Sequence, residues 1–166
     1  MINFRKLGLL EVLVFFSALY VVSTLLWTAS TRSAVEEKAN LIKSNHKTIV
    51  DFINNQINKC DNGDEQSKTI WGDKCNDTWS SQKIIKYINI NLNLKNPYSK
   101  SGNIVMSAQD PRLQAEGKAG QSTEMGMIFL SSKNFESDPG SEWVIGTCVK
   151  SPCVAAGNNE LTSIYR

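Results

Sequence analysis

The sequence predicts an α+β fold, in which one long N-terminal helix packs on a small antiparallel β-sheet. Residues 9–61 contain no Pro and no Gly, and at 1.5 Å per residue a helix of this length would be about 80 Å long. Two β-type runs follow at 124–131 and 142–149, with the turn-forming Asp138-Pro139-Gly140 between them. Strands that follow a helix, rather than alternate with helices, indicate an α+β arrangement.

The first half of the helix, residues 7–28, has the properties of a membrane span. Its only charged residue is Glu11, and about 20 mostly apolar residues suffice to cross the hydrocarbon core. Arg5 and Lys6 precede the run, and basic residues stay on the cytoplasmic side of a membrane. We therefore expect a single pass through a membrane, with the N-terminus in the cytoplasm.

Two simpler interpretations of this segment are a cleaved signal peptide and a plain anchor. A signal peptide has an apolar core of about 7–15 residues, which is shorter than this run. A carboxylate in hydrocarbon costs a few kcal/mol, and neither a discarded signal nor a plain anchor has a use for Glu11 there. Glu11 lies close enough to the cytoplasmic face to reach it, so the plain anchor stays open.

The residues 9–14, Leu-Leu-Glu-Val-Leu-Val, resemble the core of type IV pilins and type II secretion pseudopilins. The resemblance implies a basic leader at residues 1–6, a prepilin peptidase that removes it, and a methylated new N-terminus at Leu7. Glu11 would then be the fifth mature residue. In the family this glutamate pairs with the N-terminal amine of a neighbouring subunit, so the cost of burying it is met on assembly.

The chain departs from the family pattern at the cleavage site. The family has Gly before the cut, whereas Lys6 stands there, and Gly8 comes two residues later. A cut after Gly8 would leave Glu11 third rather than fifth. Either the leader is cut at an atypical site, or the chain stays uncleaved and Glu11 faces Arg5 or Lys6.

The second half of the helix, residues 29–62, is amphipathic. Apolar positions recur every three or four residues along one face. They are Val35, Ala39, Ile42, His46, Ile49, Ile53, Ile57 and Cys60. His46 is the only histidine, and on an apolar face we interpret it as a hydrogen-bonded core residue rather than a metal ligand or catalytic base. Asn62-Gly63 is a helix stop signal.

The remaining chain divides into a connecting region, 63–122, and a sheet region, 123–166. Residues 81–90 are expected to form a short helix or strand, and the Asn-, Ser- and Gly-rich residues 92–120 a long connection. Residues 161–165 are expected to supply a third strand. The acidic turn at 61–65 lacks the spacing of an EF-hand, and we interpret it as a solvated turn.

Four cysteines lie on the outer side of the predicted membrane span: Cys60, Cys75, Cys148 and Cys153. An even number in a small extracytoplasmic domain indicates disulfides, and four cysteines allow three connectivities. Chain proximity favours the two pairs 60–75 and 148–153. A zinc site is disfavoured because no CxxC pair is present. The family resemblance also implies that the second pair forms a C-terminal loop exposed on a filament.

The functional expectation is assembly rather than chemistry. The net charge is only +2 and basic residues are scattered, so nucleic-acid binding is not indicated. No catalytic set, metal site or cofactor motif is evident, and we expect no enzyme. The resemblance implies a subunit in a bacterial inner membrane that self-associates into a helical filament, periplasmic or on the cell surface. Such a filament would serve adhesion, motility or DNA uptake and would form with the aid of an assembly machinery. The alternatives are a type II secretion pseudopilin and a single-pass anchored binding protein that never assembles.

Overall fold

The computed structural model describes residues 8–63, 67–99, 102–118, 124–132 and 142–165. The chain divides into two compact units, residues 1–37 and 38–166.

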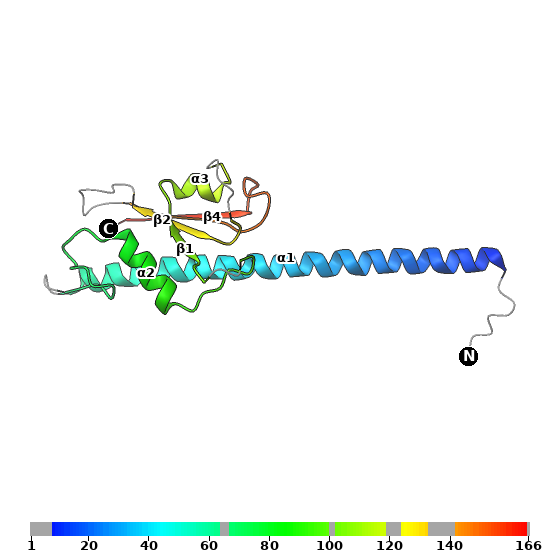
Figure 1. Ribbon diagram of the computed structural model, residues 1–166, viewed down its shortest axis with the longest axis horizontal. Coiled ribbons are helices and arrows are strands. Elements are labelled where there is room, and N and C mark those ends of the chain that lie inside the picture. Colours follow the sequence, from blue (N-terminus) through cyan, green and yellow to red (C-terminus); the bar gives the residue numbers. More distant parts are fainter. Residues whose placement is uncertain (1–7, 64–66, 100–101, 119–123, 133–141, 166) are drawn as a thin grey trace. The chain divides into compact units, whose positions relative to one another are not determined.

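The long helix α1 runs from Leu9 to Asp61, over 53 residues (Figure 1). At its start the amides of Glu11 and Val12 donate to the carbonyl of Gly8, at 3.0 and 3.2 Å. At its end the amide of Gly63 donates to the carbonyl of Cys60 at 3.3 Å, and the polar pair 62–63 closes the last turn. The prediction of one uninterrupted helix is confirmed.

Within its described residues, the second unit combines the end of α1 with two short helices and four strands. The elements are α2 (Ser81–Asn91), β1 (Val105–Ser107), α3 (Pro111–Ala115), β2 (Ile128–Ser132), β3 (Trp143–Cys148) and β4 (Asn159–Ile164). The strands form one sheet in the order β1-β2-β3-β4. Strands β2, β3 and β4 correspond to the three predicted runs, and residues 81–90 are helical.

The sheet is mixed, which corrects the expectation of a purely antiparallel one. The pairs β2–β3 and β3–β4 are antiparallel, but β1 is parallel to β2, with Val105 opposite Ile128. Residues 92–120 are also not one long connection, since they contain β1 and α3. A three-residue strand is too short to show a pattern. It is held by Asn89 of α2, whose Oδ1 accepts from the amides of Ile104 and Val105 at 3.0 Å and whose Nδ2 donates to the carbonyl of Val105 at 2.9 Å.

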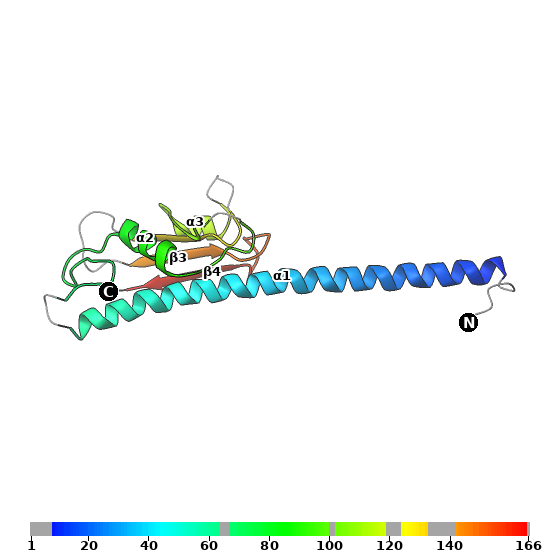
Figure 2. The same cartoon turned by 60° about the horizontal axis from the view of Figure 1, so that its bottom comes forward.

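The second unit has three layers, because helices cover both faces of the sheet. The part of α1 after residue 38 lies on one face and α3 on the other (Figure 2). Neighbouring residues of β3 show the alternation: Thr147 contacts His46 of α1, whereas Gly146 lies directly under Pro111 of α3. Side chains of a strand point alternately to the two faces, so alternate residues of β3 face α1 and α3.

The main core lies between α1, α2 and the sheet. Its fully buried side chains are mostly Ile: Ile49, Ile53, Ile84, Ile88, Ile128 and Ile145. The predicted apolar face of α1 is buried from Ala39 to Ile57, including His46, whereas Val35 is exposed and Cys60 is half-buried. A smaller cluster of Ala108, Met127 and Phe129 is separate from this core.

Candidate functional site

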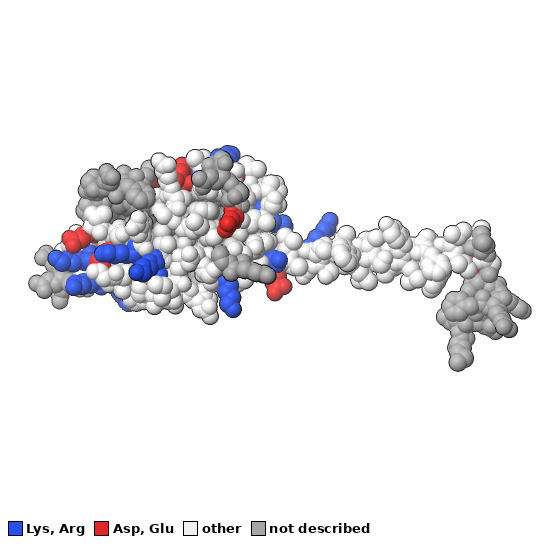
Figure 3. Space-filling view, in the orientation of Figure 1, with Lys and Arg blue, Asp and Glu red and all other residues white. Residues whose placement is uncertain are grey.

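The candidate assembly surface is the apolar part of α1 within the first unit. The large apolar side chains from Leu10 to Trp27 are exposed, Leu10 and Trp27 each at 74%. The visible face of this stretch carries no Lys or Arg (Figure 3), and the helix is long and apolar enough to cross a membrane. So much apolar surface is not left in water by a soluble monomer. It therefore requires a cover, either lipid or other protein.

Five Ser and Thr hydroxyl groups in this part of α1 are hydrogen-bonded locally. Each donates to a backbone carbonyl three or four residues earlier, at 2.8–3.1 Å; they belong to Ser17, Ser23, Thr24, Thr28 and Thr31. An unpaired polar group costs several kcal/mol in hydrocarbon, and back-bonding of this kind removes most of that cost. These hydroxyls are therefore compatible with an apolar surrounding.

Glu11 caps the helix that carries it. Its Oε2 accepts a hydrogen bond from the amide of Gly8 at 3.0 Å, while its own amide donates to the Gly8 carbonyl. The bond from the Gly8 amide to the Glu11 side chain is one half of a capping box, with Gly8 at the N-cap and Glu11 three residues later. The sequence signal for it, Gly followed three residues later by Glu at a helix start, can be seen in the printed chain but did not enter the prediction.

Three residues of the predicted processing and assembly site lie outside the described residues: Arg5, Lys6 and Leu7. A contact between Glu11 and Arg5 or Lys6 therefore stays a prediction. Gly8 is the one processing candidate whose contacts are described, and it is the hydrogen-bond partner of Glu11.

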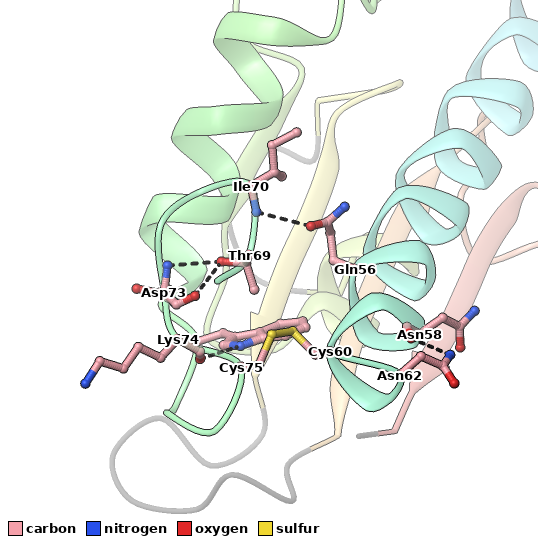
Figure 4. Close-up of a disulfide and its surroundings, with 10 residues drawn as sticks. Gln56, Asn58, Cys60, Asn62, Thr69, Ile70, Asp73, Lys74 and Cys75 are labelled. Atoms are coloured by element: carbon pink, nitrogen blue, oxygen red, sulfur yellow. Dashed lines mark hydrogen bonds between the residues drawn. A yellow bond between two sulfur atoms is a disulfide. The ribbon is translucent and has the colours of Figure 1, made fainter. Parts of the chain in front are cut away.

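The first disulfide joins Cys60, in the last turn of α1, to Cys75 (Figure 4). It fixes the loop that begins at Ser67 against the end of the helix. The same loop is held a second time by Gln56 of α1, whose Oε1 accepts from the amide of Ile70 at 3.1 Å. The amide of Cys75 donates to the carbonyl of Ser67 at 2.8 Å, which closes the loop on itself.

The second disulfide joins Cys148, at the end of β3, to Cys153 in the connection to β4. The connection is closed by the amide of Val149, which donates to the carbonyl of Asn158 at 2.8 Å. Val154 beside the bridge is 60% exposed. Both disulfides thus join the cysteines that chain proximity paired, and the second one staples the β3–β4 hairpin as predicted.

His46 is a buried link between α1 and the sheet. Its Nδ1 lies 3.0 Å from the Thr147 hydroxyl of β3, and its Nε2 lies 2.9 Å from the Thr162 hydroxyl of β4. Burial lowers the pKa of His46 below its ordinary value of 6.5, and the nearby Glu160 carboxylate partly offsets this. The prediction of a hydrogen-bonded core residue is confirmed. Among the described residues no three His, Cys, Asp or Glu side chains come together to hold a metal ion.

No protein-family model, curated protein or solved structure matches the chain. What the structure does supply is a pilin-like arrangement of elements: a long N-terminal helix, apolar and exposed in its first part, whose later part packs on a small mixed sheet.

Proposed function

We propose that this chain is a subunit of a type IV pilus-like filament, which assembles when the apolar part of α1 packs against the same part of other copies. The observation that carries the proposal is the exposed apolar surface from Leu10 to Trp27, which also contains Glu11 close to its start. Lipid would cover this surface before assembly, and other subunits would cover it afterwards.

Glu11 favours assembly over a plain anchor. The amide of Gly8 gives one hydrogen bond to one oxygen of this carboxylate, whereas an ionised carboxylate can accept about four hydrogen bonds. A positive partner from a neighbouring copy would meet that remaining need and would set the register between subunits. In a plain anchor this carboxylate would serve the helix cap alone, and its charge would have no partner to bind.

The second unit, residues 38–166, is called the head from here on. It is consistent with an extracytoplasmic location. Its two disulfides are typical of proteins that fold in an oxidising compartment. With the N-terminus in the cytoplasm, the second unit would lie in the periplasm and then on the filament surface. A type II secretion pseudopilin has the same requirements, and it differs in the filament that it joins.

The test is the N-terminal sequence and intact mass of the chain from the sheared extracellular fraction of its native host. A methylated chain that begins at Leu7 or Leu9, found in filaments, supports the proposal. A chain that begins at Met1 and stays in the inner membrane contradicts it, and leaves the anchored binding protein.

Two single substitutions, compared side by side, test whether Glu11 directs assembly. Glu11→Leu is expected to remove the chain from the sheared fraction while its level in the membrane is unchanged. The matched control is Glu37→Leu, which changes an exposed glutamate of the same helix outside the apolar run. If both variants assemble like the original chain, Glu11 does not direct assembly.

A further inference from the structure

A groove of about 560 Å³ runs along the last turns of α1. Phe52, Asn55, Lys59 and Asn62 form its helical side, and Ile70 of the disulfide-bonded loop lies along it. Phe52, Asn55 and Lys59 are three and four residues apart, which places them on one face of α1, and Asn62 follows directly after the last turn. The groove lies wholly within the second unit.

The side chains of this groove include uncommitted hydrogen-bonding groups. Among the described residues, no hydrogen bond or ion pair engages the side chains of Asn55, Asn58 and Lys59, all of which are exposed. Each carboxamide can donate and accept. Of the residues that the structure describes, Lys59 is the one charged residue lining the groove, and none of the described carboxylates lines it. The site therefore presents one positive charge beside several amides.

The walls of the groove are already fixed. The disulfide between Cys60 and Cys75 and the bond from the Ile70 amide to Gln56 hold the loop side (Figure 4). On the helix side, Asn62 Nδ2 donates to the carbonyl of Asn58 at 2.7 Å. A ligand would thus not have to order the backbone around it, which lowers the cost of binding.

We propose that this groove binds an acidic glycan, a carbohydrate chain that carries carboxylate groups. Sugar hydroxyls both donate and accept, so they match Asn55 and Asn58, and a sugar carboxylate matches Lys59. The faces of the sugar rings that carry C–H groups would lie on Ile70, which is 50% exposed.

A peptide fits the groove less well than a glycan. The recurring modes of peptide recognition need a free strand edge, an apolar groove for a helix, or exposed aromatic faces for a proline-rich segment. The described walls are one helix face and one loop. One face of the Phe52 ring is stacked on Tyr87, with ring centroids 5.8 Å apart. The proposal also does not depend on filament assembly, because a chain that never assembles keeps the groove.

The test is titration of the full chain, in lipid nanodiscs free of sugar-based detergent, with tetragalacturonate. Neutral galactotetraose and a tetra-glutamate peptide are the comparison ligands. We expect tetragalacturonate to bind more tightly than either, with shifts in the side-chain amide signals of Asn55 and Asn58 in ¹H–¹⁵N NMR spectra. The double variant Asn55→Ala/Lys59→Gln should weaken binding by about tenfold or more.

The matched control is Asn93→Ala/Lys86→Gln, which removes an exposed amide and an exposed lysine that do not line the groove. Its net charge equals that of the groove variant, and its affinity should stay within about twofold of the original chain. Equal weakening in both variants would mean unspecific charge attraction and would overturn the proposal. Absence of binding by tetragalacturonate, or preference for the peptide, would overturn it as well.

Discussion

Glu11 and Gly8 form two hydrogen bonds with each other at the start of α1. The amide of Gly8 donates to Glu11 Oε2 at 3.0 Å, and the amide of Glu11 donates to the carbonyl of Gly8 at 3.0 Å. The two possible cleavage sites differ in what they do to this pair. A cut after Lys6 keeps the Gly8 amide, whereas a cut after Gly8 removes it together with the cap. The cap therefore favours processing before Leu7, if the leader is removed at all.

The charge and the hydrogen bond of Glu11 can be separated. Glu11→Gln keeps an oxygen that accepts from the Gly8 amide but loses the charge, so helix capping is retained. We expect Glu11→Gln to reduce the filament yield as strongly as Glu11→Leu, if a positive partner is what assembly needs. Quantifying the sheared and membrane fractions checks this. Normal assembly of Glu11→Gln would show that the cap, rather than the charge, matters.

The head is expected to lose stability in mild acid because of His46. The pKa of His46 is lowered in the folded chain by burial, so the unfolded chain binds the proton more tightly. The stabilisation is therefore complete above about pH 6.5, the unfolded value, and is lost as the pH falls below it towards the folded value. Urea unfolding of the full chain in detergent at pH 7.5 and 5.5, followed by near-UV circular dichroism, measures the difference.

The pH test has an internal control because His46 is the only histidine in the chain. His46→Gln removes the titrating group, and its stability should change much less between these two pH values, although it is lower at both. An equal loss of stability in His46→Gln and in the original chain would assign the acid effect to carboxylates instead.

The partner of His46 on β3 is expected to contribute to stability by itself. Thr147→Val keeps the shape of a side chain with no exposed surface but leaves His46 Nδ1 without its 3.0 Å partner. The expected loss is about 1–3 kcal/mol in the free energy of unfolding. Thr48→Val, on the exposed side of α1, should change it by about 0.5 kcal/mol or less. Similar values for the two variants would mean that water replaces Thr147 at the histidine.

Gly146 is required where α3 crosses the sheet. A Cβ at this position would fall inside contact distance of the Pro111 carbonyl and would press on Ala115. Gly146→Ala is therefore expected to destabilise the head by about 1–3 kcal/mol, the usual range for overpacking. Gly102→Ala serves as the control, since no atom lies within 4 Å of its added Cβ. Thermal unfolding compares the two, and equal midpoints would show that α3 moves aside at little cost.

The two disulfides should differ in what they contribute. The bridge 60–75 spans a sequence separation of 15 and the bridge 148–153 a separation of 5. In the chain-entropy model these loops are worth about 3 and about 2 kcal/mol. Double Cys→Ser variants of each pair, unfolded in urea, test the order. If loss of the 148–153 pair costs more, the β3–β4 hairpin depends on its bridge for native structure and not only for loop closure.

Much of the architecture can be read from local patterns. The absence of Pro and Gly from residues 9–61 predicts α1, and its apolar run predicts an exposed surface from Leu10 to Trp27. The three- and four-residue spacing predicts the buried face around His46. These features depend on neighbours a few residues apart, which is why periodicity and composition reveal them. The short loops between paired cysteines made the disulfide pairing predictable for the same reason.

Other features depend on where distant segments meet. β1 exists because Asn89 of α2 holds one side of it and Ile128 lies opposite Val105, so neither its presence nor its parallel direction has a local signal. The hydroxyl partners of His46 are 101 and 116 residues away. The groove requires Ile70 to lie against the end of α1. Periodicity indicates which side chains leave water, but only the path of the folded chain determines which of them meet.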